Sequence, residues 1–422
     1  MDPTEISHQI YDVLAAQTAV KPPRIRTWGG DTWGPIDASA TLVLRHPGAL
    51  RSMLLPLSDL SAGEAYIYDD VDIEGDIFSV LDFALSIDDS PPSPTAAVKL
   101  YRLLRQLPKG SPGSRSRRPR LFGARHSLRR DRAAISHHYD TGNEFFRQFL
   151  DPALVYSSAV FLCPTDTLET AQRRKLDLIC RKLDLGPGKR FLDVGCGWGA
   201  LVVHAASEYG ATAVGVTLSA EQADYAKILA KEHGVDDRVT IEQRDYREVD
   251  GSFEAIASVG MVEHVGADQL GIYFDRLRDL LTPDGVLLNH GIVHAGDQGR
   301  PERSSRKEAG FMDTYVFPDG ELERLGVVVD TAEGAGLEVR DVESLRTSYA
   351  LTLRRWVANL ESNHDAAVSA ASEDAYRIWR AYMAGAAVAF ETGRLSVYQL
   401  VLSNPGSPWV FGRSTLLASD DT

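Results

Sequence analysis

The strongest constraint on the fold of this chain is a glycine-rich turn that follows a short apolar run. Residues 190–194 read Arg-Phe-Leu-Asp-Val, which is typical of a buried strand, and Gly195, Gly197 and Gly199 follow at alternate positions. A helical apolar pattern begins at Leu201. Because glycine has no Cβ, this backbone can approach a ligand closely. The order strand, glycine turn, helix predicts a nucleotide-type cofactor site at the carboxyl end of a parallel strand.

The spacing of the turn favours a particular kind of cofactor. The third glycine of the dinucleotide-binding fingerprint falls one position later than Gly199 does here. Asp193, just before the first glycine, suits a cationic amino-acid tail or a ribose better than a pyrophosphate. The pattern Asp-x-Gly-x-Gly-x-Gly resembles the first motif of class I methyltransferases, which bind S-adenosylmethionine (SAM). An ordinary glycine-rich strand–helix turn is the alternative interpretation.

Strand patterns alternate with helical patterns up to about residue 345, which predicts a parallel, doubly wound sheet. Residues 351–389 are expected to be helical. The predicted fold class is α/β: a doubly wound, Rossmann-like class I methyltransferase domain with a smaller N-terminal α+β domain. The predicted strands are 190–194, 212–216, 239–243, 255–259, 285–290 and 337–344, and the predicted helices between them are 201–208, 220–233, 267–281 and 325–335.

Three segments are expected along the chain. Residues 1–107 read as the small α+β domain, and its acidic stretch 60–76 lacks EF-hand spacing and is interpreted as a solvated strand edge or turn. Residues 108–132 are rich in Arg, Pro and Gly, which predicts a linker that is either a flexible tether or a segment attracted to anionic headgroups. The catalytic domain is expected over 133–422. In the first segment, helices are predicted over 6–19, 47–55 and 77–85, and strands over 24–28 and 40–45.

Composition excludes several function classes. The formal net charge of −14 argues against a general nucleic-acid-binding protein. The three cysteines lack metal-binding spacing and are expected to be reduced and unpaired, so no metal site is predicted. The polar start has no secretory pattern, and no stretch reaches the ~20 apolar residues of a membrane span. We therefore expect a cytoplasmic protein that contacts the inner face of the membrane peripherally.

Polar side chains follow the second and third strands of the predicted sheet, where each turn opens on the ligand crevice. Thr217 and Gln222 are neutral groups that can bond ribose hydroxyls, at a place where many class I methyltransferases have a carboxylate. Asp245 can accept from an adenine amine and Tyr246 can stack on the ring. For Asp245 alone, a helix N-cap is an equal alternative. Together the turns favour the cofactor interpretation.

Glu263 and His264 follow the fourth predicted strand, and His290 ends the fifth. Adjacent residues on a helix do not share a face, so we expect Glu263 to take part in chemistry and His264 to be structural. A lone histidine is more often a core residue than a catalyst, but the place of His290 beside Glu263 in the sheet order favours function. The aromatic stretch 135–161 is either a helical cover or a lid whose Tyr156 and Ser157 reach the cofactor.

A set of longer motifs carries a resemblance to a known family. They are HYDTGN (138–143), LDP (150–152), Tyr156-Ser157, LDVGCGWG (192–199), GVTLSAEQ (215–222), DYR (245–247) and VGMVEHVG (259–266). Together they resemble cyclopropane-fatty-acyl-phospholipid synthases, over roughly residues 135–402 and more loosely over the N-terminal segment. The resemblance implies transfer of a methylene group from SAM to the cis double bond of an unsaturated phospholipid acyl chain. It also implies an N-terminal domain for lipid binding and dimerisation, so a homodimer is expected.

The resemblance further implies a bicarbonate ion near the transferred methyl group, acting as general base. Its ligands correspond to Glu263, His290, the backbone of Ile292, and Tyr349. Ser158 stands where the family has a cysteine, and its hydroxyl can still donate a hydrogen bond. The residues expected to bind SAM are Tyr156, Ser157, Asp193, Gly195, Cys196, Gly197, Thr217, Leu218, Gln222, Asp245 and Tyr246.

Such chemistry requires a dry apolar pocket. An alkene is a weak nucleophile, so the site must align the sulfonium methyl with the double bond. The resulting carbocation is stabilised by aromatic faces and nearby negative charge. A base within hydrogen-bond range must then remove a proton from the added methyl group. Candidate wall residues, each of which is otherwise plain core, are Tyr139, Phe145, Phe146 and Tyr315.

Three other outcomes stay open from the sequence. Loss of a proton from the acyl chain instead of the methyl group gives a methylene- or methyl-branched fatty acid. A small-molecule methyltransferase has a polar pocket and needs no bicarbonate ligands. An inactive lipid-binding homologue is suggested by Ser158 alone. SAM turnover with cis-unsaturated phospholipid vesicles separates these outcomes.

Overall fold

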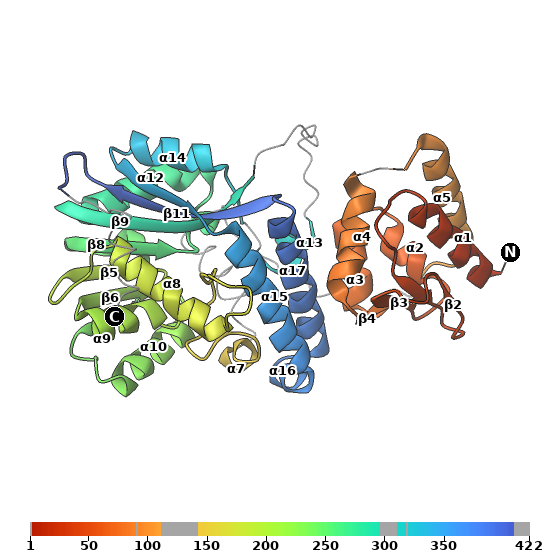
Figure 1. The fold of residues 1–422 in the computed structure, drawn as a ribbon, viewed down its shortest axis with the longest axis horizontal. Coiled ribbons are helices and arrows are strands. Elements are labelled where there is room, and N and C mark those ends of the chain that lie inside the picture. Colours follow the sequence, from red (N-terminus) through yellow and green to blue (C-terminus); the bar gives the residue numbers. More distant parts are fainter. Residues whose placement is uncertain (1, 90–91, 111–141, 296–309, 318–319, 409–422) are drawn as a thin grey trace. The chain divides into compact units, whose positions relative to one another are not determined.

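The computed structural model describes residues 2–89, 92–110, 142–295, 310–317 and 320–408. By its internal contacts the chain divides into two compact units, whose elements are labelled in Figure 1. The first unit combines Met1–Arg120 with Arg303–Pro318 and His364–Val388, and the second combines Leu121–Glu302, Asp319–Asn363 and Ala389–Thr422. Tyr139 and residues 111–132 of the predicted linker lie outside the described residues.

The second unit is built on a mixed seven-stranded sheet of order β10-β11-β9-β8-β5-β6-β7. β5 pairs in parallel with β6 and β8, β6 with β7, and β8 with β9. This confirms the predicted α/β fold class. The strands are β5 (Arg190–Val194), β6 (Thr212–Thr217), β7 (Val239–Gln243), β8 (Phe253–Val259), β9 (Leu281–His294), β10 (Glu338–Ser344) and β11 (Leu395–Ser403).

The expectation of a wholly parallel sheet is wrong at β11. This strand follows α17 (Glu373–Glu391) and runs antiparallel to both of its neighbours, β9 and β10. Its register with β9 extends from Leu395 opposite His294 to Ser403 opposite Val286. β11 follows a long helix after a short turn. Its apolar pattern is typical of a strand, but nothing in its own sequence indicates which strands it pairs with. The inserted strand places polar side chains of β11 next to the functional end of β9.

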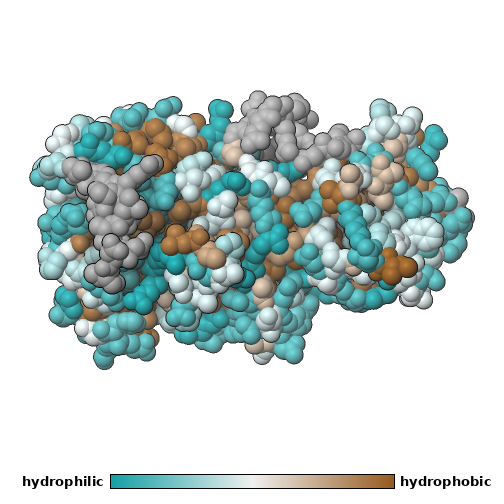
Figure 2. Space-filling model, in the orientation of Figure 1, coloured by the Kyte–Doolittle hydropathy of each residue, from teal (hydrophilic) through white to brown (hydrophobic). Residues whose placement is uncertain are grey.

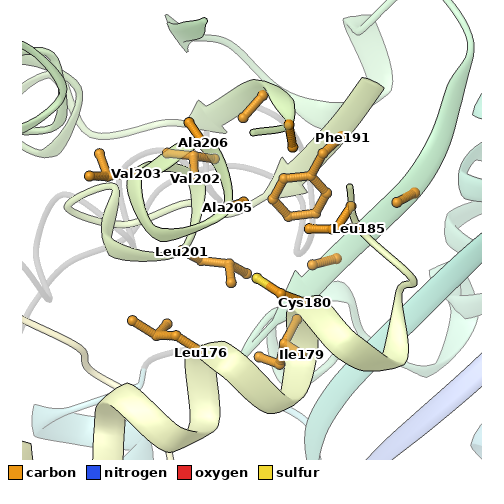
Figure 3. Packing of buried hydrophobic residues seen from close by; sticks show 14 of the residues in the cluster. Leu176, Ile179, Cys180, Leu185, Phe191, Leu201, Val202, Val203, Ala205 and Ala206 are labelled. Carbon is orange, nitrogen blue, oxygen red and sulfur yellow. The ribbon is translucent and has the colours of Figure 1, made fainter. Parts of the chain in front are cut away.

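Helices cover both faces of this sheet. Side chains alternate along β5, so successive residues of the strand lie on opposite faces. Phe191 belongs to a hydrophobic cluster with α8 (Leu168–Lys182), α9 (Ala200–Tyr209) and α10 (Ala220–Glu232). Figure 3 shows side chains of α8 and α9 converging on Phe191. Leu192 and Val194 belong to the opposite cluster, with α12 (Leu270–Leu280) and α14 (Leu325–Gly334). By the same alternation Asp193 lies on the face that α8 covers.

Helix α14 is apolar on more than its buried side. Val328 and Ala332 are buried against the sheet, while Leu325, Val327 and Val329 keep partial exposure. In Figure 2, brown apolar residues gather over α14 on the face shown.

Among the described helices, none is both long and apolar enough to cross a bilayer. The three cysteines, Cys163, Cys180 and Cys196, are free.

The remaining elements of the second unit are short helices at strand ends and one long helix. The long helix, α15, is the first part of the region predicted to be helical over 351–389, and α16 (His364–Ala370) and α17 form the rest. The short helices and the long helix of the second unit are α7 (Asn143–Phe146), η1 (Tyr246–Glu248), α11 (Val262–Val265), η2 (Ala267–Gln269) and α15 (Arg346–Ser362).

The first unit contains a four-stranded sheet of order β2-β1-β3-β4. The interpretation of residues 60–76 as a strand edge or turn is wrong for their first half, which is helix α3. Ser58 caps this helix, since its Oγ accepts a hydrogen bond from Ser61 N–H at 3.1 Å, and Ala65, Tyr66 and Ile67 are buried. The elements of this unit are α1 (Pro3–Ala15), β1 (Arg24–Arg26), β2 (Thr32–Trp33), β3 (Ala40–Leu44), α2 (Ala49–Leu54), α3 (Asp59–Ile67), β4 (Val71–Gly75), α4 (Ile77–Asp89), α5 (Pro94–Gln106) and α13 (Phe311–Tyr315), together with α16 and all but the last turn of α17.

Candidate active site

The glycine turn after β5 has the conformation that its sequence predicts. Gly195, Gly197 and Gly199 all have positive φ, at +81°, +54° and +88°. A Cβ on Gly195 would lie 2.5 Å from Met261 Sδ, and one on Gly199 would lie 2.7 Å from Ala226 Cβ. A Cβ on Gly197 would meet no atom within 4 Å among the described residues. Packing therefore requires two of the glycines, while the third borders open space that a ligand can approach.

Asp193 is a buried carboxyl directly before this turn. Its residue is 2% exposed, and burial raises its pKa to about 7, against the opposing effect of Lys175. Lys175 projects from α8 on the same face of the sheet and is equally buried, and burial lowers its pKa to about 8. A ligand ammonium group here would offset the desolvation of the carboxylate. This electrostatic setting fits the cationic amino-acid tail predicted from the sequence.

Helix α8 also holds the segment that contains Tyr156 and Ser157. Lys175 Nζ donates to Ser157 Oγ at 2.9 Å. Gln172 Nε2, one turn earlier on the helix, donates to the carbonyls of Val155 (3.2 Å) and Ser157 (2.9 Å). One face of α8 thus links Ser157 to the neighbourhood of Asp193. Neither Gln172 nor Lys175 was singled out from the sequence.

At the end of β6, the predicted neutral groups are paired with each other. Thr217 Oγ1 donates to Gln222 Oε1 at 2.8 Å, and Thr217 Oγ1 accepts from Ser219 N–H at 3.3 Å. Leu218 lies between them, and its carbonyl accepts from Gln243 Nε2 at 3.2 Å. Because Gln222 Oε1 accepts the bond from Thr217, the amide nitrogen is the part of the side chain that can donate to a hydroxyl group of a ligand.

At the end of β7, Asp245 adopts the alternative role considered for it. It caps η1, since its Oδ1 accepts from Arg247 N–H at 2.9 Å. The Arg247 guanidinium also binds both carboxylate oxygens, at 2.7 and 2.8 Å. Tyr246 is buried edge-on against Tyr273, with ring centroids 5.6 Å apart. Oδ1 accepts two of these bonds, but Oδ2 accepts one and keeps a second lone pair, so the N-cap does not prevent a contact between Oδ2 and an adenine amine.

Glu263, after β8 in α11, is the most distinctive carboxyl of the site. Its Oε1 accepts from Ile292 N–H at 2.8 Å, while its Oε2 is buried without a partner among the described residues. Burial raises the pKa of Glu263 to about 7. Two residues named by the resemblance are therefore in direct contact, and the backbone of Ile292, which the resemblance names as a bicarbonate ligand, donates its N–H to Glu263.

His290 lies two residues before Ile292 on β9, opposite Val259 at the end of β8. Burial lowers its pKa to about 3, and the positive charges of Lys175 and Lys182 act in the same direction. The imidazole is therefore neutral at physiological pH. Its Nδ1 lies 3.3 Å from Gln399 Nε2.

Ser158 and Tyr349, also named by the resemblance, lie on other elements. Ser158 is fully buried, and its hydroxyl donates to the carbonyl of Ala159 at 3.0 Å. The neighbouring Ala159 N–H donates to Thr352 Oγ1 of α15 at 3.0 Å. Tyr349 of α15 is buried, with its ring 4.6 Å from that of Phe390. In this structure the Ser158 hydroxyl is thus directed at the backbone.

An aromatic cluster surrounds Tyr156. Its ring stacks on Trp356 of α15, with centroids 5.2 Å apart, and meets Phe146 edge-on at 5.7 Å. Trp198, from the glycine turn, lies 5.1 Å from Phe146 and donates from Nε1 to Asn143 Oδ1 at 2.7 Å. Phe145 and Phe146 are fully buried in this cluster. Trp356 and Trp198 are aromatic residues of the site that sequence reasoning passed over.

Tyr315 belongs to the other unit. Its hydroxyl donates to Glu64 Oε1 at 3.1 Å and lies 3.0 Å from the Tyr68 hydroxyl, both on or beside α3. Tyr315 therefore makes its contacts within the first unit, with residues about 250 positions away in sequence that no local pattern connects to it.

Comparison with known proteins agrees with this geometry. The family model described as mycolic acid cyclopropane synthetase matches residues 126–400. The chain belongs to this family. It is an SAM-dependent methyltransferase with a class I methyltransferase core, as the resemblance implied.

Relatives match over nearly the whole length of this family member. A "Probable fatty acid methyltransferase" of Pseudomonas putida is 37% identical over 395 residues, which are 93% of this chain and 94% of that one. A protein of Mycobacterium tuberculosis with the same description is 36% identical over 93% of each chain. The solved structure of the mycolic acid cyclopropane synthase CmaA1, complexed with SAH and CTAB, has 35% identity and a TM-score of 0.61. The match covers 64% of this chain and 97% of the CmaA1 chain.

Proposed function

We propose that this family member transfers a methylene group from SAM to the cis double bond of an unsaturated phospholipid acyl chain and so forms a cyclopropane ring. The alkene electron pair forms a bond to the sulfonium methyl as the carbon–sulfur bond breaks, which leaves a carbocation on the chain. The added methyl then loses a proton, and the released electron pair closes the ring. The products are S-adenosylhomocysteine, the cyclopropane and a proton.

The observation that carries this proposal is the buried Glu263 carboxyl. A buried oxygen without a partner is costly, and Glu263 Oε2 is such an atom. With a pKa raised to about 7, this carboxyl carries a proton part of the time near neutral pH and can donate it to an anion. A small-molecule methyltransferase working only by alignment has no need of this group. A reaction that ends with removal of a proton from carbon does.

The donor set of the site fits a small anion. A bicarbonate bound here would supply the base that takes the methyl proton, as the resemblance implies. We propose that Glu263 and His290 hold it, since Glu263 has a buried oxygen without a partner among the described residues and His290 has a neutral imidazole beside the end of β8. Ile292 supports it indirectly by fixing Glu263 through a 2.8 Å hydrogen bond. We propose that Tyr349 completes the set.

The aromatic cluster suits the cationic intermediate. Tyr156 and Trp356 present stacked rings, and the faces of such rings attract cations, with an effect of about 2 kcal/mol or more where water is excluded. Phe146 and Phe149 extend the cluster and keep it apolar. These residues are proposed to align the acyl chain and to exclude water from the carbocation.

The test is product analysis. Purified protein is incubated with SAM and vesicles of a cis-unsaturated phosphatidylglycerol, with fully saturated vesicles as the control. Released fatty acids are then examined by mass spectrometry and proton NMR. The proposal expects a mass gain of one methylene and cyclopropane proton signals with the unsaturated lipid alone. SAM turnover that is equal on saturated vesicles, or a product without ring protons, contradicts it.

A second candidate is formation of a methylene- or methyl-branched fatty acid on the same substrate class. The observation in its favour is Ser158, whose hydroxyl donates to the Ala159 carbonyl. If this group does not help to hold the base, a proton can leave the acyl chain instead of the added methyl. The same product analysis separates the candidates, because a branched product shows methyl or exocyclic methylene signals. A Ser158→Cys variant is expected to shift a mixed product towards the ring.

The N-terminal segment is proposed to bind lipid and to mediate a homodimer, as the resemblance implies. The arginine-rich linker is proposed to attract anionic headgroups, each arginine near a charged membrane contributing on the order of 1 kcal/mol. Sedimentation with anionic and neutral vesicles tests the first point, and analytical ultracentrifugation tests the dimer. Binding that is equal on both vesicles contradicts the electrostatic role.

A further inference from the structure

Gln399 is a buried amide that faces a residue of the proposed site. On antiparallel strands β11 and β9, Gln399 lies directly opposite His290, so the two side chains share a face of the sheet. Gln399 Nε2 lies 3.3 Å from His290 Nδ1, and the two residues are 0% and 2% exposed. An amide nitrogen only donates hydrogen bonds. Nδ1 of His290 must therefore be the acceptor.

This contact decides which ring nitrogen carries the proton. A neutral imidazole has one N–H and one acceptor nitrogen, and the lowered pKa of His290, about 3, keeps the ring neutral. With Nδ1 accepting from Gln399, the proton resides on Nε2. The ring then offers a donor at its other edge, which suits an anion. The opposite tautomer would present a lone pair there and repel the anion.

The orientation of the amide follows from the burial of its other end. Gln399 Oε1 is buried and has no partner among the described residues. Turning the amide around would satisfy Oε1 with a ring proton but would bury an entire NH₂ group without a partner. Buried orphan N–H groups are rarer in proteins than under-satisfied oxygens. The arrangement with Nε2 against the ring is the less costly of the two.

We propose that Gln399 is a positioning residue that holds His290 in the Nε2–H tautomer and so makes it a hydrogen-bond donor towards the proton-abstracting anion. This inference rests on the proposed role of His290 in that function. In this proposal Gln399 acts through His290 and has no direct contact with substrate or base. Groups that orient the ligands of a reactive centre in this indirect way commonly change activity 10–100-fold when removed.

The first test reads the tautomer directly and needs no turnover. The full-length protein is labelled with ¹⁵N-histidine, and the His290 signals are assigned by their loss in a His290→Gln variant. Long-range proton–nitrogen correlation distinguishes a protonated from an unprotonated ring nitrogen. The proposal expects a protonated Nε2 and an unprotonated Nδ1 in the wild type. A protonated Nδ1 overturns it, whatever the product of the reaction proves to be.

The second test is a Gln399→Met variant, which keeps side-chain length but removes the donor. We expect kcat to fall 10–100-fold, SAM affinity by calorimetry to stay within twofold, and the Nε2–H signature to weaken. Tyr398→Phe, whose side chain packs on the opposite cluster, is the matched control for disturbance of β11. An altered tautomer with unchanged kcat overturns the inference. A failed cyclopropane assignment leaves the wild-type NMR result intact, so the two failures are distinguishable.

Discussion

Replacing Glu263 with Gln is expected to abolish turnover and yet stabilise the protein at alkaline pH. Burial raises the pKa of this carboxyl from 4.5 to about 7, and a pKa difference of one corresponds to about 1.4 kcal/mol. The folded state therefore holds the Glu263 proton more tightly than the unfolded state does. This contribution to stability is complete below pH 4.5 and is lost as pH rises to and beyond about 7. The loss amounts to about 3 kcal/mol.

Glutamine cannot ionise, so the variant escapes this loss. It retains an oxygen for the 2.8 Å bond from Ile292 N–H, and any fixed cost of its buried amide is the same at all pH values. The free energy of unfolding is measured by urea titration at pH 5 and pH 8.5, without SAM. At pH 5 a small part of the loss has already occurred, so the advantage of Glu263→Gln over wild type should grow by about 2.5 kcal/mol between these values.

The assay has a control for charge and a clear contradiction. Glu232→Gln removes an exposed carboxylate on α10 and should show no comparable growth between the two pH values. Turnover of SAM in Glu263→Gln should fall at least 10²-fold, since the group proposed to hold the base is altered, while SAM affinity stays near wild type. An advantage that is equal at pH 5 and pH 8.5 would refute the burial argument, and full turnover would remove Glu263 from the mechanism.

Three further predictions concern the cofactor site. SAM affinity should rise with pH through about 7, because the ammonium of the ligand prefers the ionised Asp193 carboxylate. Calorimetry on Asp193→Asn should show weaker binding without this dependence, and a retained slope would exclude Asp193 as its source. Lys175→Met removes the donor to Ser157 and the positive charge that opposes the rise in the Asp193 pKa, so SAM should bind about tenfold more weakly. Lys175→Arg should recover part of the loss, and unchanged binding in the Met variant contradicts the role. Gly199→Ala should lose on the order of 2–3 kcal/mol of stability, because its Cβ would meet Ala226 at 2.7 Å. Gly197→Ala, which meets no atom within 4 Å, should lose only about 1 kcal/mol but should weaken SAM binding more; the reverse ranking contradicts this account of the turn.

The sequence predicted those parts of the fold that depend on local periodicity. β5 and β7 have the predicted bounds, and α10 ends one residue before its predicted end, because apolar spacing and a Ser219 cap are local signals. β11 was missed, since its antiparallel place between β9 and β10 depends on tertiary pairing. The helix α3 was missed because its acidic residues obscured the apolar ones that it buries.

The same distinction between local patterns and tertiary pairing separates the site residues that were predicted from those that were not. The contact between Glu263 and Ile292 joins two residues that the family resemblance had named. Gln172, Lys175 and Gln399 lie on elements without a motif of their own, and their roles come from the faces that α8 and β11 turn towards the sheet. No periodicity distinguishes a buried lysine that supports a cofactor segment from one that lies on the surface. The direction of the Ser158 hydroxyl likewise depends on backbone conformation that its neighbours in sequence do not determine.

Burial has reversed the usual order of pKa values among the acidic side chains and the histidine of this site. Asp193, Glu263 and Lys175 have pKa values of about 7, 7 and 8, whereas that of His290 is about 3. A bell-shaped rate profile centred near neutrality would ordinarily suggest an imidazole to an enzymologist. Here such a profile would report the titration of two carboxyl groups and an amine. His290 would stay neutral and would contribute the same proposed hydrogen bond over the whole pH range of the profile.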